Sequence, residues 1–273
     1  MYVQYTFYSS ETIVNSTSKI IFTDNYQAMI IGSRKLYFEK LASTNSHAHA
    51  MLRKGKVQEG TVVYTAFQSA GKGQAGNRWE SEKGMNILMS VILFPTVIRA
   101  DRQFYLTKII SLGVCDYLRS CSIDASIKWP NDIYVKDFKA GGILIENSII
   151  RNEIDHCVAG IGLNVNQKSF PPEIPNPTSM SLITGREYDV EQCISDLCQK
   201  LDARYKQLIY NKTGRIDEDY KSSLYRLNQF TEFRDSRGIF EGRIISVSDS
   251  GRLHIEDRRG RIYEYGFREV DFL

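Results

Sequence analysis

The stretch KWPNDIYVKDFKAGGILIE, residues 128–146, predicts two β-strands that flank a Pro-Asn-Asp turn, because both flanks are rich in Ile, Leu and Trp. Two lysines, a carboxamide and a carboxylate stand near the strand ends: Lys128, Lys139, Asn131 and Asp132. A polyphosphate with its magnesium ion needs such a mixture, since lysines contact phosphate oxygens and a carboxylate holds the metal. A solvated hairpin with a plain turn explains these residues equally well.

Around this stretch the chain alternates between strand-like and helix-like segments. Residues 86–94 form a continuous apolar run, which predicts a strand buried on both faces. Glycines interrupt the apolar segment 156–165, so either a ligand approaches this strand or, as is favoured a priori, the strand contains a bulge. Further strands are expected at 35–39 and 61–67, and helices at 47–52, from Asp101 to about Leu118, and over 189–210 and 215–226.

The glycine-rich segment Gly71–Gly76 fits the pattern G-x-G-x-x-G and follows a predicted strand. A dinucleotide-binding fingerprint also needs a helix after the glycines and an acidic residue at the right distance to hold a ribose, and neither is present. No Lys-Ser or Lys-Thr follows the last glycine, which excludes a P-loop. The segment is therefore either a loop that binds an anion or a plain connection, and composition alone favours the plain connection.

The composition is that of a globular protein. Hydrophobic residues make up 42% and charged residues 25% of the 273 residues, which excludes disorder of the whole chain. The formal net charge of +3 is too small to indicate nucleic-acid binding by itself. The five cysteines form no C-x-x-C pair, so buried thiols are favoured over a disulfide or zinc framework. No apolar run reaches the roughly 18–20 residues of a membrane span, and no signal peptide is recognised, so a cytoplasmic protein is expected.

The last part of the chain has a different pattern. From Gln229 onward short strand-like segments alternate with hairpin turn signals such as Asp249-Ser250-Gly251. This pattern suits a small β-barrel that packs on the main domain. We expect three parts: an N-terminal extension at residues 1–28, a main domain at 29–227 and a small β-barrel at 228–273.

Taken together, five motifs in this order resemble the biotin–protein ligase family: Ser43-Thr44-Asn45, QSAGKGQAGNRW at 68–79, KWPND at 128–132, KAGGILIE at 139–146 and GIGLN at 160–164. The resemblance covers about residues 31–270. It implies an α+β fold related to class II aminoacyl-tRNA synthetases. In that fold a mixed β-sheet backed by helices forms the catalytic domain, and a small SH3-like β-barrel follows.

The resemblance implies an enzyme that uses ATP and Mg²⁺ to convert biotin to biotinyl-5′-AMP and then transfers biotin to a lysine of a carrier protein. The carrier would be a biotin carboxyl carrier protein, as for a biotin–[acetyl-CoA-carboxylase] ligase, or part of a related biotin-dependent carboxylase. Neither DNA nor a membrane is expected as a partner, and a homodimer is left open.

The resemblance also implies residue roles. Lys139 would contact the reacting carboxylate and the α-phosphate, and Lys128 and Asp132 would also be catalytic. Asn131 would bind the nucleotide together with the two lysines, and Asp132 would hold the metal. The ureido head of biotin would bind the Ser-Thr-Asn turn and Gln68, Trp79 would cover its rings, and two glycines would let the backbone approach it. The full set expected to bind biotin or biotinyl-AMP is Ser43, Thr44, Asn45, Gln68, Gly71, Lys72, Gly73, Gln74, Trp79, Gly142 and Gly160.

The sequence departs from the family pattern in the glycine-rich loop. Many members have arginine where Lys72 stands, and some have a second arginine where Gln74 stands. Lysine keeps the charge but loses the planar fork that grips a phosphate with two hydrogen bonds. We therefore expect looser retention of biotinyl-AMP than in arginine-rich relatives.

Two other functions within this superfamily are considered. A lipoate– or octanoate–protein ligase would keep the adenylate chemistry but needs a linear apolar pocket, in which the polar Ser-Thr-Asn turn and Gln68 would be unpaired. A non-catalytic biotin-binding regulator would lack Lys139 or add a recognition helix. Only 42 residues precede Ser43, against the roughly 60 of a winged DNA-binding module. A ligase without a repressor domain is the expectation.

Overall fold

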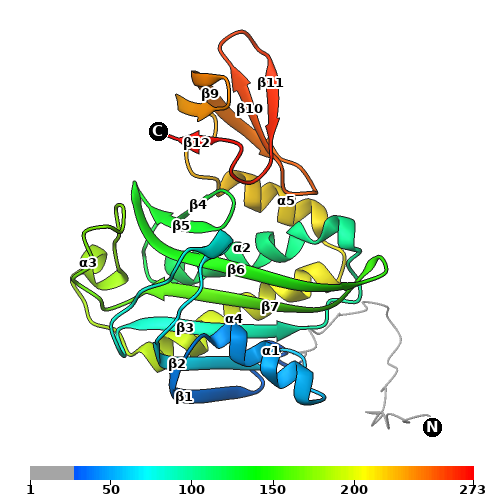
Figure 1. The fold of residues 1–273 in the computed structure, drawn as a ribbon, viewed down its shortest axis with the longest axis vertical. Helices are drawn as coiled ribbons and strands as arrows, with labels where there is room; N and C mark the ends of the chain where they lie inside the picture. The colour runs from blue at the N-terminus through cyan, green and yellow to red at the C-terminus, as the bar shows by residue number, and fades with distance from the viewer. Residues whose placement is uncertain (1–27) are drawn as a thin grey trace, which may run out of the picture.

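The structure, a computed structural model, describes residues 28–273, and a seven-stranded mixed sheet forms its main body (Figure 1). The predicted extension therefore lies outside the described residues, apart from residue 28. In space the strands follow the order β1-β2-β3-β7-β6-β5-β4, with β1 and β2 parallel and every other pair antiparallel. Their bounds are β1 (Lys35–Leu41), β2 (Val62–Gln68), β3 (Asn86–Leu93), β4 (Ser126–Lys128), β5 (Asp132–Val135), β6 (Phe138–Ile150) and β7 (Glu153–Asn164).

The centre of the sheet is its most apolar part. Every residue of β3 is buried, which confirms the strand predicted from the continuous apolar run. Strand β6 is longer than the sequence predicts, because it begins at Phe138 and therefore includes Lys139.

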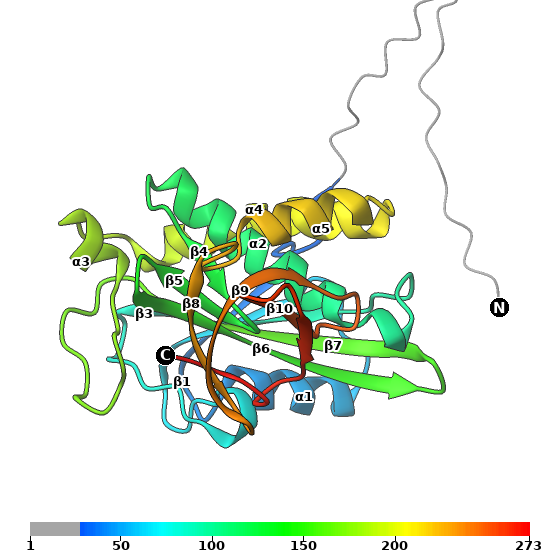
Figure 2. The same ribbon diagram turned by 90° about the horizontal axis from the view of Figure 1, so that it is seen from above.

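Helices cover both faces of the sheet, as Figure 2 shows: α2, α4 and α5 lie on one side and α1 on the other. Helix α1 spans Thr44–Lys54, and it packs on β2, β3 and β7. None of the described helices has the length and apolarity that a membrane crossing requires. The remaining helices are α2 (Phe104–Ser120), the short α3 (Met180–Thr184), α4 (Val190–Ile209) and α5 (Thr213–Ser222).

Two predicted helix ends are wrong. Helix α2 begins at Phe104, because Ala100–Arg102 form a separate 3-10 turn and Asp101 does not cap the helix. Helix α5 ends at Ser222 instead of continuing to residue 226. Arg226 has a φ of 56°, a left-handed conformation that an α-helix cannot include.

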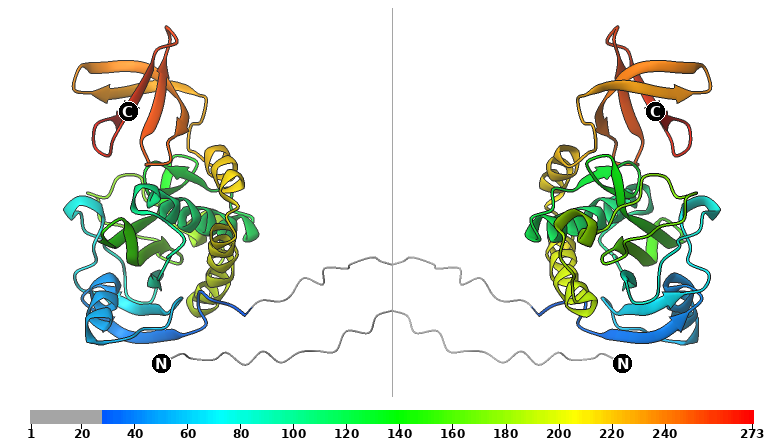
Figure 3. Two further views of the ribbon diagram at one scale, coloured as in Figure 1. Left: turned by 90° about the vertical axis from the view of Figure 1, so that its right-hand side faces the viewer. Right: turned by 90° about the vertical axis from the view of Figure 1, so that its left-hand side faces the viewer.

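A second, five-stranded antiparallel sheet follows at the end of the chain and stands on one end of the main body (Figure 3). It contacts the main body through Trp129, whose Nε1 donates a hydrogen bond to the carbonyl of Gly251 at 2.9 Å. The mixed sheet with its helices and this small β unit confirm the predicted fold class, while the division at residue 228 stays a prediction. The strands are β8 (Phe230–Asp235), β9 (Gly238–Val247), β10 (Leu253–Asp257), β11 (Ile262–Tyr265) and β12 (Asp271–Phe272).

Gly113 is the point of close approach between helices α2 and α4. A Cβ atom there would lie 2.7 Å from Leu201 Cδ2 and 3.1 Å from Leu201 Cα. We expect Gly113→Val to lower the free energy of unfolding by about 2 kcal/mol, because overpacking typically costs about 1–3 kcal/mol. Urea denaturation measures this loss. Gly214→Val is the matched control, since nothing lies within 4 Å of the Cβ position at that helical glycine. Equal losses in both variants would contradict the packing argument.

Candidate active site

The start of helix α1 provides a buried polar cluster. Ser43 is the N-cap of the helix, and Thr44 and Asn45 form its first turn instead of a separate turn. Each of the three residues is at most 4% exposed. Buried polar groups need hydrogen bonds to offset their desolvation, and groups that also line a cavity can offer their remaining hydrogen-bonding capacity to a ligand.

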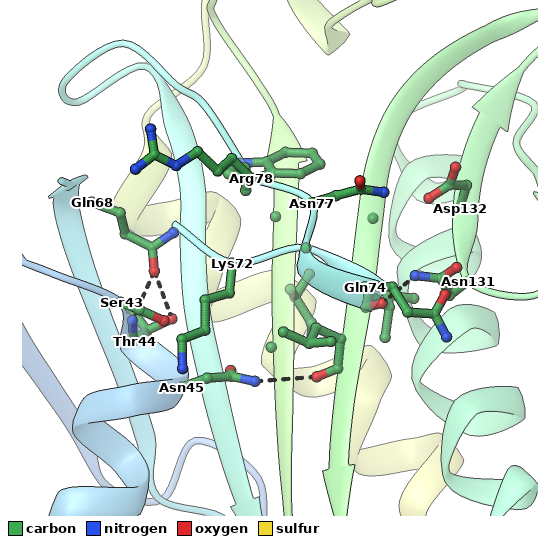
Figure 4. Close-up of a pocket in the computed structure, with 18 of the residues that line it drawn as sticks. Ser43, Thr44, Asn45, Gln68, Lys72, Gln74, Asn77, Arg78, Asn131 and Asp132 are labelled. Atoms are coloured by element: carbon green, nitrogen blue, oxygen red, sulfur yellow. Dashed lines mark hydrogen bonds between the residues drawn. The ribbon is translucent and has the colours of Figure 1, made fainter. Parts of the chain in front are cut away.

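Gln68 joins this cluster from the end of β2. Strands β1 and β2 are parallel and end together at the pair Leu41 and Gln68, so the loop after β1 and the side chain of Gln68 meet at one sheet edge. Gln68 Oε1 accepts a hydrogen bond from Thr44 N at 2.7 Å and lies 3.2 Å from Thr44 Oγ1. The predicted neighbourhood of the Ser-Thr-Asn segment and Gln68 is thus present (Figure 4).

The glycine-rich loop folds back on itself beside this cluster. Gly73 N donates to Asn77 O at 2.7 Å, and Trp79 N donates to Gly71 O at 3.1 Å. In Figure 4 the side chain of Lys72 extends toward the start of α1, whereas that of Arg78 extends sideways, above Gln68 in this view. The loop therefore forms a hairpin-like turn, closed by its own backbone hydrogen bonds, that borders the cavity described below.

Trp79 lies on two glycines of the central strands. Gly142 of β6 and Gly162 of β7 are directly opposite each other in the sheet. A Cβ at Gly162 would lie 2.5 Å from Trp79 Cε2, and a Cβ at Gly142 would lie 3.2 Å from Trp79 Cζ3. Because neither glycine has a side chain, the indole ring can pack directly against the sheet.

Gly160 makes room for Asn45 in the same way. A Cβ at Gly160 would lie 2.4 Å from Asn45 Oδ1. The pairing of β7 with β3 and β6 is regular across this segment, so the bulge interpretation of these glycines is wrong. Gly142 and Gly160 both line the cavity described below, and the expectation that they let the backbone approach biotin stays a prediction.

Lys139 and Asp132 form an ion pair on the opposite side of the cavity. Lys139 Nζ lies 2.6 Å from Asp132 Oδ1, and both side chains are only partly exposed. Segment 171–178, which contains four prolines, fixes the backbone of Lys139: Lys139 N donates to Asn176 O at 2.6 Å, and Thr178 N donates to Lys139 O at 2.9 Å. Asn131 is also held, because its Nδ2 donates to the carbonyl of Ile143 at 2.6 Å.

Lys128 has a different position from the one expected. It does not line the cavity. Its ammonium group lies 4.8 Å from the ring centroid of Tyr134 and 5.2 Å from that of Phe272 in the C-terminal sheet. Burial lowers the pKa of Lys128. The structure therefore places Lys128 in an aromatic environment beside the site, and its predicted catalytic and nucleotide-binding roles stay predictions.

The residues described so far surround a cavity of about 210 Å³. Gly71 is outside its lining, because its carbonyl and Cα are occupied by the turn to Trp79. The predicted residues that line it are Ser43, Thr44, Asn45, Gln68, Lys72, Gly73, Gln74, Trp79, Asn131, Asp132, Lys139, Gly142 and Gly160. Lining residues that sequence reasoning missed are Asn77, Arg78, Met89, Pro130, Ile143, Leu144, Ile161, Gly162 and Phe267.

Among the lining residues that sequence reasoning missed, Phe267 lies farthest along the chain from the motifs. It follows β11 in the C-terminal unit, and no motif in its surroundings marks it. Phe267 also borders a second hollow, which shares Gln74, Pro130, Asn131 and Ile143 with the first. The two hollows therefore adjoin, and the second lies between the main body and the C-terminal sheet.

Two polar atoms of the glycine-rich loop region have unmet hydrogen-bonding capacity. Gln74 Oε1 and Trp79 Nε1 are buried without a hydrogen-bond partner among residues 28–273. Such atoms are rare in folded proteins unless water or a ligand satisfies them. Both residues line the cavity, which supports ligand binding there.

No metal cage of protein side chains is present in the described part of the chain, where no three His, Cys, Asp or Glu residues cluster suitably. Magnesium commonly binds through one or two carboxylates together with substrate phosphates and water. Asp132, which faces the cavity, fits that mode as a single carboxylate. Its metal-binding role stays a prediction.

Known proteins are similar to this chain in sequence and in fold. The model of the Biotin/lipoate A/B protein ligase family matches residues 37–164. The bifunctional ligase/repressor BirA of Bacillus subtilis (strain 168) is 30% identical over 235 residues, which span 85% of this chain and 72% of that protein. The biotin–[acetyl-CoA-carboxylase] ligase of Mycobacterium tuberculosis is 28% identical over 185 residues, 66% of each chain.

A solved structure gives the same result for the fold. Biotin protein ligase from Aquifex aeolicus in complex with biotin and ATP superposes with a TM-score of 0.74 at 25% identity and covers 88% of this chain and 99% of that chain. The match spans both the mixed sheet and the C-terminal unit, since it exceeds the length of either alone. On these similarities of sequence and fold, the chain belongs to the biotin/lipoate A/B protein ligase family.

Proposed function

We propose that this chain is an ATP-dependent biotin–protein ligase, which forms biotinyl-5′-AMP and transfers biotin to a lysine of a biotin carboxyl carrier protein. One observation carries the proposal: a single cavity has the buried polar cluster of Thr44, Asn45 and Gln68 on one side and the Lys139–Asp132 pair on the other. Figure 4 shows the polar cluster and Asp132 on either side of the glycine-rich loop. The relatives' names support the same activity.

The polar cluster suits the ureido head of biotin. A cyclic urea has two N–H donors and a carbonyl acceptor, which match buried hydroxyl and amide groups. Trp79 and the apolar Met89 and Ile161 border the same cavity and would cover the rings. A linear lipoyl or octanoyl chain would leave the buried polar groups of Thr44 and Asn45 without new partners, at an energetic cost.

Lys139 would promote the first step by electrostatics. The carboxylate of biotin attacks the α-phosphorus of ATP; a C–O–P bond forms and the bond to pyrophosphate breaks. Both reactants are anions, so positioned cations lower the barrier. Lys139 faces the cavity, and Lys72 extends along its rim, where the loop can bring its charge to the adenylate. The adjoining hollow offers room for the nucleotide.

The Mg²⁺ that accompanies ATP would be held by Asp132 together with nucleotide phosphates, where it would supply positive charge to the phosphate oxygens. The carboxylate of Asp132 already lies against Lys139, so the binding of the nucleotide and its metal would separate the two side chains of this ion pair.

In the second step, the amine of a carrier lysine attacks the acyl carbon of biotinyl-5′-AMP, and AMP leaves as the amide forms. No enzyme side chain needs to become acylated. Asp132 is within reach of the same cavity and would accept the proton of the incoming amine. The carrier would be the biotin carboxyl carrier protein of acetyl-CoA carboxylase or of a related carboxylase, with the reaction in the cytoplasm.

Lys139→Ala should lower the rate of pyrophosphate release by about 100- to 1,000-fold, because removal of one positioned donor typically costs about 2.7–4 kcal/mol in the transition state. A coupled pyrophosphate assay with biotin, ATP and Mg²⁺ measures it, and circular dichroism checks the fold. Lys168→Ala, which removes a solvent-exposed ammonium paired with Glu187, is the matched control and should keep full activity. Wild-type turnover by Lys139→Ala would remove Lys139 from the mechanism.

Biotin should raise the melting temperature, whereas lipoate and octanoate should not. At a concentration of 100 times Kd, binding adds about 2.7 kcal/mol of stability, which for a protein of this size is a shift of roughly 5–10 °C. Differential scanning fluorimetry measures the shift. A larger shift with lipoate than with biotin would favour the lipoate–protein ligase.

The double variant K72R/Q74R should release biotinyl-AMP roughly tenfold more slowly than the wild type, equivalent to about 1.4 kcal/mol. Arginine at both positions would grip the phosphate with two parallel hydrogen bonds and add one charge. Release is measured by dilution of preformed intermediate into excess unlabelled biotin. Lys83→Arg is the control, because Lys83 is exposed and paired with Glu39. An unchanged off-rate in the double variant would show that the loop residues do not limit retention.

A further inference from the structure

Asn45 is fixed at both ends of its side-chain amide. Its Oδ1 lies 2.5 Å from Ser90 Oγ, and its Nδ2 donates to Glu146 Oε2 at 2.8 Å. A longer contact of 3.4 Å joins Nδ2 to the carbonyl of Leu144. Gly160 closes the space beneath the amide. The amide therefore has one orientation, and the carboxylate of Glu146 determines it, because a carboxylate only accepts hydrogen bonds.

The direction of hydrogen bonding then propagates to the polar cluster. Ser90 is fully buried, and its Oγ lies 2.7 Å from Thr44 Oγ1 as well as 2.5 Å from Asn45 Oδ1. The serine hydroxyl has one hydrogen, and the amide oxygen of Asn45 cannot supply another. Ser90 therefore donates to Asn45, and Thr44 donates to Ser90. The contact of Thr44 Oγ1 with Gln68 Oε1 is longer, 3.2 Å, and that oxygen already accepts from Thr44 N.

This order of hydrogen-bond donation leaves acceptor lone pairs on two residues that line the cavity. With its hydrogen directed at Ser90, Thr44 Oγ1 retains lone pairs, and Asn45 Oδ1 retains a second lone pair. Thr44 and Asn45 line the cavity, while Ser90 and Glu146 do not. The cluster thus offers acceptors to a ligand, which suits the N–H groups of a cyclic urea.

Glu146 is itself held from the outer side. Its Oε2 lies 3.2 Å from His49 Nε2, and the His49 ring packs against that of His156 at a centroid distance of 5.9 Å. His156 in turn contacts Asp155 at 2.7 Å. Helix α1 and strands β6 and β7 therefore converge on the carboxylate and fix its position behind the cavity.

We propose that Glu146 is a positioning residue for recognition of the cyclic urea: through Asn45 and Ser90 it sets the direction of hydrogen-bond donation, so that Thr44 and Asn45 present acceptors to the ligand. The inference rests on the proposed biotin ligase function. It predicts that substitution of Glu146 weakens the binding of biotin selectively and leaves the chemistry of ATP unaffected.

Glu146→Met removes the acceptor at similar side-chain length. We expect the KM for biotin to rise about tenfold, while the KM for ATP and kcat at saturating biotin change less than about twofold. Glu146→Gln should keep the wild-type KM, because its amide oxygen can take the place of Oε2, which faces both Asn45 Nδ2 and His49 Nε2, and accept from Asn45. The matched control is Glu153→Met, the same replacement at an exposed position on the neighbouring strand β7.

Biotin analogues methylated on one ureido nitrogen test whether the cluster accepts hydrogen bonds from the ligand. The wild type should discriminate against at least one of them by more than about tenfold, since a site built to accept from N–H rejects an analogue without it. Glu146→Met should discriminate less than about threefold. A purely structural defect would weaken all ligands alike.

Ser90→Ala keeps the inference testable if Glu146→Met does not fold, because it removes the donor to Asn45 and should also raise the KM for biotin about tenfold. A wild-type KM for biotin in folded Glu146→Met, or in Ser90→Ala, would overturn the inference. Absence of biotinyl-AMP formation by the wild type would instead overturn the proposed function.

Discussion

The register of strand β6 against β7 is the constraint on which the site depends. It places Gly142 opposite Gly162 and Leu144 opposite Gly160, so that three glycines lie together on one face of the sheet, where Trp79 and Asn45 pack. A shift by one residue would move every side chain to the other face of the sheet. Both residues would then clash with larger side chains. The pairing of β7 with the whole length of the buried strand β3 opposes such a shift.

The same register connects recognition with chemistry. Strand β6 carries Lys139 at its start, the glycine beneath Trp79 in its middle and Glu146 four residues further on. One rigid strand therefore supports the cation, the aromatic cover and the carboxylate that holds Asn45. Such support on a strand keeps reactive groups in place without a loss of entropy at the moment of reaction.

The sequence predicts the fold and much of the site, since buried strands leave apolar runs and the motifs lie at strand ends. Two features have no local signal. The position of Lys128 depends on the packing of Phe272 from the C-terminal sheet, and the contribution of Phe267 depends on how that sheet docks. For the glycines of segment 156–165 the sequence leaves a close approach and a bulge open, and the tertiary contacts with Asn45 and Trp79 decide between them.

The central claim is that one cavity brings the carboxylate of biotin to the α-phosphate of ATP. Its most direct test is mass spectrometry of the small molecules formed when the purified protein is incubated with biotin, ATP and Mg²⁺. We expect biotinyl-5′-AMP and an equal amount of pyrophosphate, and both only when biotin, ATP and Mg²⁺ are all present. A folded protein that binds both substrates and forms no such adduct would contradict it.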